Sequence, residues 1–135
     1  MHALILTLWL TQTNPLDAAY AALRVNRYDA AIALFQQGLA ATPDAVATRK
    51  DLAYTLLKTG DTDAGREQFR LALDYAPQDH HLALEYAFLC FEAKERRTAR
   101  LIFDRVRREG GPAEKATAQT AFANVDGDLE GGLKR

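Results

Sequence analysis

The sequence contains few side chains whose types and spacing could perform chemistry. His80 and His81 follow Asp79, and Glu85 lies four residues after His81, which would place His81 and Glu85 on one face of a helix. Imidazole and carboxylate can bind zinc, but zinc sites use three or four ligands and no second pair lies nearby. Asp79 is also a good helix N-cap. The sequence therefore favours a helix start here and predicts no metal site and no cofactor.

No other cluster suggests catalysis. The acidic segment 124–130 is similar to part of a calcium-binding loop but lacks glycine at the sixth position and glutamate at the twelfth. We interpret it as a helix end and a turn. The single cysteine, Cys90, lies among apolar residues, which predicts a buried and unreactive thiol. Without a phosphate-binding glycine loop, a nucleophile elbow or an HExxH motif, an enzyme is the function class that the sequence favours least.

The composition is that of one ordinary globular domain. The chain has 135 residues, 48% of them apolar and 26% charged, with a formal net charge of −1. This balance argues against a nucleic-acid-binding protein. Segment 94–109 is locally basic, with seven basic and three acidic residues. We interpret it as a solvated outer face on which Asp104 pairs with Arg100 or Arg108, and the alternative is contact with an anionic partner.

A repeat with a period of about 34 residues organises the chain, and such a period is typical of a stack of small helical units. Side chains of one kind return at this constant spacing: Phe35, Phe69 and Phe103; Tyr20, Tyr54 and Phe88; Ala19, Ala53 and Ala87; Ala31, Gly65 and Ala99; Pro43 and Pro77. Apolar spacing and helix-stop residues predict helices over Pro15–Val25, Tyr28–Ala41, Ala45–Lys58, Asp63–Tyr75, Asp79–Ala93, Arg96–Glu109 and Pro112–Asn124.

The small residues predict close contact between the two helices of each unit, with the repeated phenylalanine beside that contact. Asn26 and Gly60 occupy equivalent turns, where either residue tolerates a left-handed backbone. Lys94 takes the third such position, and because a positive φ strains a residue with a Cβ atom, we expect this turn to differ. In the last helix we expect Ala116, Ala118 and Phe122 to pack on the third unit.

Between Pro15 and Gly111 these residues resemble the tetratricopeptide repeat. The resemblance implies an all-α fold, a right-handed α-solenoid of antiparallel helix pairs. The expected divisions are an apolar N-terminal segment (1–13), a repeat domain (14–125, with units 14–44, 45–78 and 79–111 and a capping helix 112–125) and a loosely ordered tail (126–135).

The resemblance also implies a binding surface. In this family the face that carries Tyr20, Tyr54 and Phe88 lines a concave groove for extended peptides or partner helices. The expected partner-binding residues are Leu16, Tyr20, Leu23, Arg24, Lys50, Tyr54, Leu57, Lys58, His81, Leu84, Glu85, Phe88, Phe91 and Glu92. Their alternative role is packing between units. A chaperone-tail clamp of the family uses Lys and Asn where this chain has Leu16 and Tyr20, which argues against binding of chaperone C-terminal carboxylates.

The sequence thus predicts a non-enzymatic scaffold with a protein or peptide partner and no nucleic-acid partner. The alternative is an oligomerisation or accessory module, or a piece of a larger exported assembly, with self-association. The apolar run Ala3–Leu10 is too short to span a bilayer. It suits an atypical export signal, which favours an exported protein over a cytoplasmic one. The alternatives are a segment that docks on the repeats and a frayed tail.

Overall fold

The structure, a computed structural model, describes residues 14–133, with side chains described for 14–127. The described chain is all helical. Its elements are α1 (Pro15–Arg24), α2 (Tyr28–Ala41), α3 (Val46–Lys58), α4 (Thr62–Tyr75), α5 (His80–Glu92), α6 (Arg96–Glu109) and α7 (Pro112–Leu133). The predictions for segment 1–13 lie outside the described residues. Within 14–133, no helix is both long enough and apolar enough to cross a bilayer.

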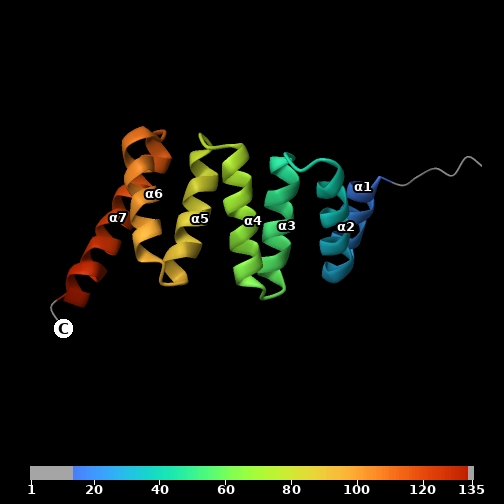
Figure 1. Ribbon diagram of the computed structural model, residues 1–135, viewed down its shortest axis with the longest axis horizontal. Helices are drawn as coiled ribbons and strands as arrows, with labels where there is room; N and C mark the ends of the chain where they lie inside the picture. Colours follow the sequence, from blue (N-terminus) through green and yellow to red (C-terminus); the bar gives the residue numbers. More distant parts are fainter. Residues whose placement is uncertain (1–13, 134–135) are drawn as a thin grey trace, which may run out of the picture.

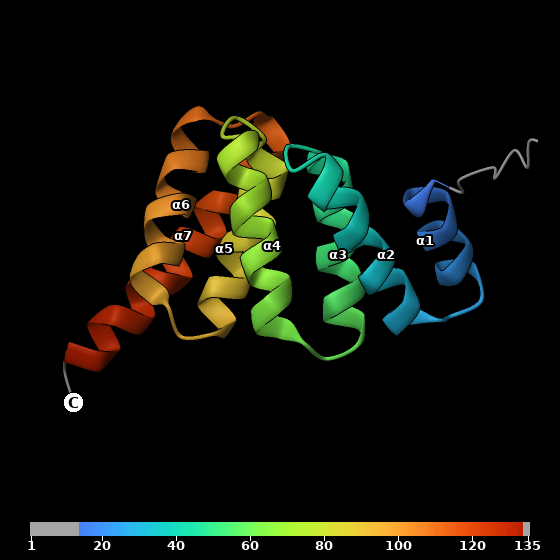
Figure 2. The ribbon, with the colours of Figure 1, turned by 45° about the vertical axis from the view of Figure 1, so that its right-hand side comes forward.

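The helices form hairpins that follow one another along the long axis of the molecule (Figure 1). The hairpins are α1–α2, α3–α4 and α5–α6, and α7 packs mainly on α6 and also touches α5. In Figure 2, α4 and α6 lie in front of α5 and α7. We call α1, α3 and α5 the A helices and α2, α4 and α6 the B helices. The predicted all-α stack of helix pairs is confirmed.

Local sequence explains where the helices begin. The Asn14 side chain accepts a hydrogen bond from the Leu16 amide at 3.0 Å, and Pro15 occupies the first helical position. Asp79 caps α5 in the same way, accepting from the Leu82 amide at 3.0 Å. The cap predicted at Asp79 is therefore confirmed.

The turn inside each hairpin repeats one geometry, and the expectation that the third turn differs is wrong. Asn26, Gly60 and Lys94 have φ values of 58°, 85° and 65°. The amide that follows each of them donates back to the carbonyl five residues earlier, as Glu95 does to Cys90 at 2.8 Å. This shared hydrogen-bond pattern imposes the left-handed backbone on Lys94 despite its Cβ atom.

The interior is built on the period seen in the sequence. Phe35, Phe69 and Phe103 are almost completely buried, each between the two helices of its own unit and their neighbours. Ala53 is fully buried beside Gly65, where an added Cβ atom would lie 3.1 Å from the Ala53 carbonyl oxygen. The small residues therefore set how closely the helices of a hairpin approach, as predicted.

The last helix departs from the prediction in two ways. It continues to Leu133, so the helix end expected near Asn124 is wrong. The division of residues 126–135 as a loosely ordered tail stays a prediction. Asp126 accepts from the Arg100 guanidinium at 2.5 Å, which ties α7 to α6 beyond the expected end, and glycine weakens a helix without forbidding it. Ala118 and Val125 are buried against the third unit, whereas Ala116 is exposed.

The basic segment lies on α6 and its charges are mostly engaged. Asp104 pairs with Arg108 at 2.6 Å, as predicted, and with Arg107 at 2.5 Å. Arg100 pairs with Asp126 instead of Asp104. Arg100 and Arg107 also lie over the Phe122 ring, at 4.7 Å and 4.1 Å from its centroid. Two of the seven basic side chains, Arg100 and Arg107, therefore help to hold α7 in place.

Enlarging a small contact residue tests the packing. We expect Ala53→Leu to lower the free energy of unfolding by about 1–3 kcal/mol, because the added volume must force α3 and α4 apart. Chemical denaturation measures the change. Ala47→Leu, at an exposed position of the same helix, is the matched control and should change stability little. Equal stabilities for the two variants would contradict the packing assignment.

The strained third turn gives a second test. Lys94→Gly removes the Cβ atom that is strained at φ 65°, but glycine also gives the unfolded chain more conformational freedom. The net effect should be a free energy of unfolding that is higher by about 0.5–1 kcal/mol. The reciprocal change, Gly60→Ala, should lower it by about 1 kcal/mol. A loss of stability in Lys94→Gly would show that the lysine side chain matters more than its backbone strain.

Candidate functional site

Three aromatic side chains occupy equivalent positions on successive A helices, and we call Tyr20, Tyr54 and Phe88 the aromatic stripe. They are 36%, 41% and 40% exposed, although large apolar groups are usually buried. Each packs edge-on against the buried phenylalanine of its own unit, with ring centroids 5.3, 5.1 and 4.9 Å apart. The core thus fixes one edge of each ring and leaves the remainder accessible.

A carboxylate on the next A helix accompanies each tyrosine. The Tyr20 hydroxyl donates a hydrogen bond to Asp51, and that bond, together with burial and the carboxylate charge, raises the pKa of Tyr20 to about 12. Glu85 lies one period after Asp51 and stands in the same relation to Tyr54. Burial and then the Glu85 charge raise the pKa of Tyr54 above its usual value. These pairs connect α1 to α3 and α3 to α5.

The pairing stops at the third position of the stripe. Phe88 has no hydroxyl group, and the residue equivalent to Asp51 and Glu85 on α7 is Gln119. The sequence analysis included Glu85 in the candidate site but missed Asp51. The signal that could have found it is the equal separation in sequence of Tyr20 from Asp51 and of Tyr54 from Glu85.

The predicted aliphatic positions are less accessible than the stripe. Leu84 is buried in the core of the third unit, and Leu16 is half-buried beside Gly38. Leu23, Leu57 and Phe91 are also half-buried and pack against core residues. At these five positions the side chains mainly pack between helices, which was the alternative left open by the sequence.

The predicted charged residues surround the stripe unevenly. Arg24, Lys58, His81 and Glu92 are exposed, whereas Lys50 and Glu85 are half-buried. Lys50 lies 3.9 Å from the Asp79 carboxylate. Arg24 and Lys58 stand in the last turns of α1 and α3, one helical turn beyond the tyrosines. Lys50, one helical turn before Tyr54, is therefore already paired.

Two hollows flank Phe88 between α5 and α7. The first has a volume of about 230 Å³ and is lined by His81, Leu84, Glu85, Phe88, Ala113, Glu114 and Thr117. The second, of about 420 Å³, is lined by Phe88, Ala116, Thr117, Thr120, Ala121 and Asn124. The contribution of α7 was missed from the sequence. Ala121 and Phe122 extend the repeated registers of Ala87 and Phe88, which could have identified α7 as equivalent to a further A helix.

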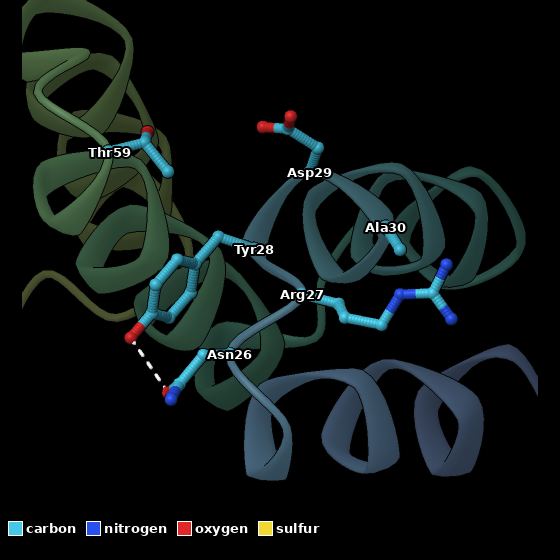
Figure 3. A pocket seen from close by; sticks show the side chains of 6 residues that line it. All are labelled: Asn26, Arg27, Tyr28, Asp29, Ala30 and Thr59. Carbon is cyan, nitrogen blue, oxygen red and sulfur yellow. Dashed lines mark hydrogen bonds between the residues drawn. The ribbon is translucent and has the colours of Figure 1, made fainter.

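A larger hollow, of about 490 Å³, lies at the turn between α1 and α2 near Thr59. The Tyr28 hydroxyl donates to the Asn26 side chain at 3.0 Å. Figure 3 shows that Arg27, Asp29 and Thr59 point in different directions. Because its polar groups do not converge, this hollow offers no set of side chains suited to one ligand.

The residues first considered for chemistry are dispersed or buried. Among the described residues, no three His, Cys, Asp or Glu side chains are close enough together to hold a metal ion. Cys90 is buried as predicted, and burial raises the pKa of its thiol. A thiol with a raised pKa forms little of the nucleophilic thiolate at neutral pH.

Comparisons with known proteins support the resemblance to the tetratricopeptide repeat. Residues 22–79 match the family model described as tetratricopeptide repeat. The fold is similar to the Sgt2 TPR domain from Aspergillus fumigatus, with a TM-score of 0.65 and 17% identity over 90% of this chain and 80% of that one. It is also similar to the first TPR of Spaghetti (RPAP3) bound to the HSP90 peptide SRMEEVD, with a TM-score of 0.66 and 14% identity over 86% and 90%. A search of curated proteins finds no significant match.

The tyrosine–carboxylate pair is directly testable. We expect Asp51→Asn to lower the Tyr20 pKa from about 12 toward the usual 10.0, because the variant loses the carboxylate that favours the protonated hydroxyl. NMR titration of ring-labelled tyrosine measures this, with Tyr20→Phe to assign the signal. In the parent chain this pair adds stability below the unfolded tyrosine pKa and loses it as pH rises through the folded one. An unchanged Tyr20 midpoint would contradict the pairing.

Proposed function

We propose that this chain, in which residues 22–79 match the tetratricopeptide-repeat model, is a non-enzymatic scaffold that binds an extended peptide or a partner helix across the aromatic stripe. The observation that carries the proposal is the equivalent, partial exposure of Tyr20, Tyr54 and Phe88 on consecutive A helices. A rigid aromatic surface that is already ordered loses little conformational entropy on binding. The two hollows beside Phe88 would accept side chains of the bound segment.

The predicted residues take graded roles in this proposal. Tyr20, Tyr54 and Phe88 supply the contact area, and Leu84 forms the floor of the hollow between α5 and α7. Leu16, Leu23, Leu57 and Phe91 support the stripe from below. The exposed charges at Arg24, Lys58, His81 and Glu92 form a rim that sets orientation more than affinity, because exposed charge pairs contribute little.

A second copy of the chain is the alternative occupant, and the stripe would then serve in oligomerisation or in a larger assembly. The partial exposure of three large rings also suits this reading. Sedimentation over a range of concentrations distinguishes the two. A mass that rises with concentration in the parent chain, and does not rise when the stripe is removed, would favour self-association over peptide binding.

A random dodecamer peptide library tests the proposal. The immobilised chain should retain a subset of peptides, and the triple variant Tyr20→Ala, Tyr54→Ala, Phe88→Ala should retain at least about tenfold less, because three exposed aromatic contacts are lost. The control variant Tyr75→Ala, Leu101→Ala removes exposed apolar groups from B helices and should bind as the parent does. Circular dichroism checks that each variant is folded. Equal retention by the parent and a folded triple variant would overturn the proposal.

A further inference from the structure

We propose that the segment bound across the aromatic stripe is cationic, with Arg or Lys side chains placed between apolar ones. This inference rests on the proposed function and specifies the chemistry of its partner. It follows from the carboxylates beside the stripe, from their lack of cationic partners and from the hollow between α5 and α7.

Asp51 and Glu85 lie in the middle of the A-helix face, one beside each tyrosine. Within residues 14–127, the ion pairs use other carboxylates, and neither Asp51 nor Glu85 is paired with a lysine or an arginine. An ionised carboxylate has about four acceptor positions, and one tyrosine hydroxyl uses only one of them. Both groups therefore keep charge and hydrogen-bonding capacity for a donor from outside.

The surroundings of Tyr54 carry excess negative charge. Burial is the largest cause of the raised pKa of Tyr54. The negative charges of Glu85, Asp51 and Asp79 raise this pKa further. Of these three carboxylates, Asp79 has a cationic partner, since the Lys50 ammonium lies 3.9 Å from it. Asp51 and Glu85 therefore remain beside the central ring without a paired cation, whereas the exposed Lys58 stands one helical turn beyond it. A cation placed over a tyrosine ring would also interact favourably with its π face.

The hollow between α5 and α7 suits a long basic side chain. Leu84 and Phe88 supply apolar lining, and the polar lining includes Glu85 and His81 from α5 and Glu114 from α7. Arg and Lys bury an apolar stem while keeping the charged head near polar groups. A volume of about 230 Å³ accommodates one such side chain and is small for a peptide backbone.

The proposed ligand chemistry differs from that of the peptide bound to the RPAP3 repeat. The RPAP3 repeat is bound to the peptide SRMEEVD, which ends in acidic residues. In this chain, an acidic peptide placed along the stripe would bring its carboxylates toward Asp51 and Glu85. Repulsion between like charges would oppose binding, so we expect the face to select against acidic segments as well as for basic ones.

The sequences retained from the dodecamer library provide the test. We expect the ratio of Arg and Lys to Asp and Glu to be at least about threefold higher in the retained pool than in the input, because two unpaired carboxylates each favour a cation modestly. The double variant Asp51→Asn, Glu85→Gln preserves size and hydrogen bonding and should abolish the enrichment. For the most enriched peptide, it should raise the Kd about three- to tenfold.

A matched control separates local charge from net charge. Glu67→Gln, Asp74→Asn removes the same two negative charges from the outer face of α4 and should leave the enrichment and the Kd unchanged. The inference would be overturned if this control raised the Kd as much as the Asp51→Asn, Glu85→Gln variant does. It would also be overturned if the retained peptides were acidic or were not enriched in Arg and Lys. Either result would leave the scaffold in place, provided that retention still requires the stripe. Retention no greater than that of the triple stripe variant would instead overturn the proposed function.

Discussion

The close approach of two helices within each hairpin is the constraint on which the remaining structure depends. Ala53 and Gly65 lack the side-chain volume that would hold α3 and α4 apart, and Phe69 fills the space beside them. The same arrangement recurs one period earlier and one period later in the chain. Because packed interiors tolerate little change in volume, this contact fixes the rotation of each helix about its own axis. That rotation decides which side chains of the A helices remain accessible.

The candidate site is a direct consequence of this geometry. Once Phe35, Phe69 and Phe103 are buried, the rings of Tyr20, Tyr54 and Phe88 pack edge-on above them and stay about two-fifths exposed. The step from one unit to the next then brings Asp51 under Tyr20 and Glu85 beside Tyr54. The repeat therefore produces both the apolar stripe and the negative charge along it.

Local sequence rules predicted most of the fold. The caps at Asn14 and Asp79 and the stops at Pro43 and Pro77 placed the first six helices within one or two residues of their observed bounds. Propensity failed where tertiary contacts override it. The Arg100–Asp126 pair extends α7 through glycines, and the turn of the third unit imposes a positive φ on Lys94. The tyrosine–carboxylate pairs were missed because the repeat period shows only which residues are equivalent in successive units. It does not show which residue of one A helix faces which residue of the next.

The proposed function requires that a partner contacts the side chains that each hairpin returns to the A-helix face. Backbone amide chemical shifts recorded while the most strongly retained library peptide is added test this directly. The account predicts that the largest changes fall on α1, α3 and α5 around Tyr20, Tyr54 and Phe88, and extend to the start of α7 near Thr117. Largest changes on the outer surfaces of α2, α4 and α6 would contradict it.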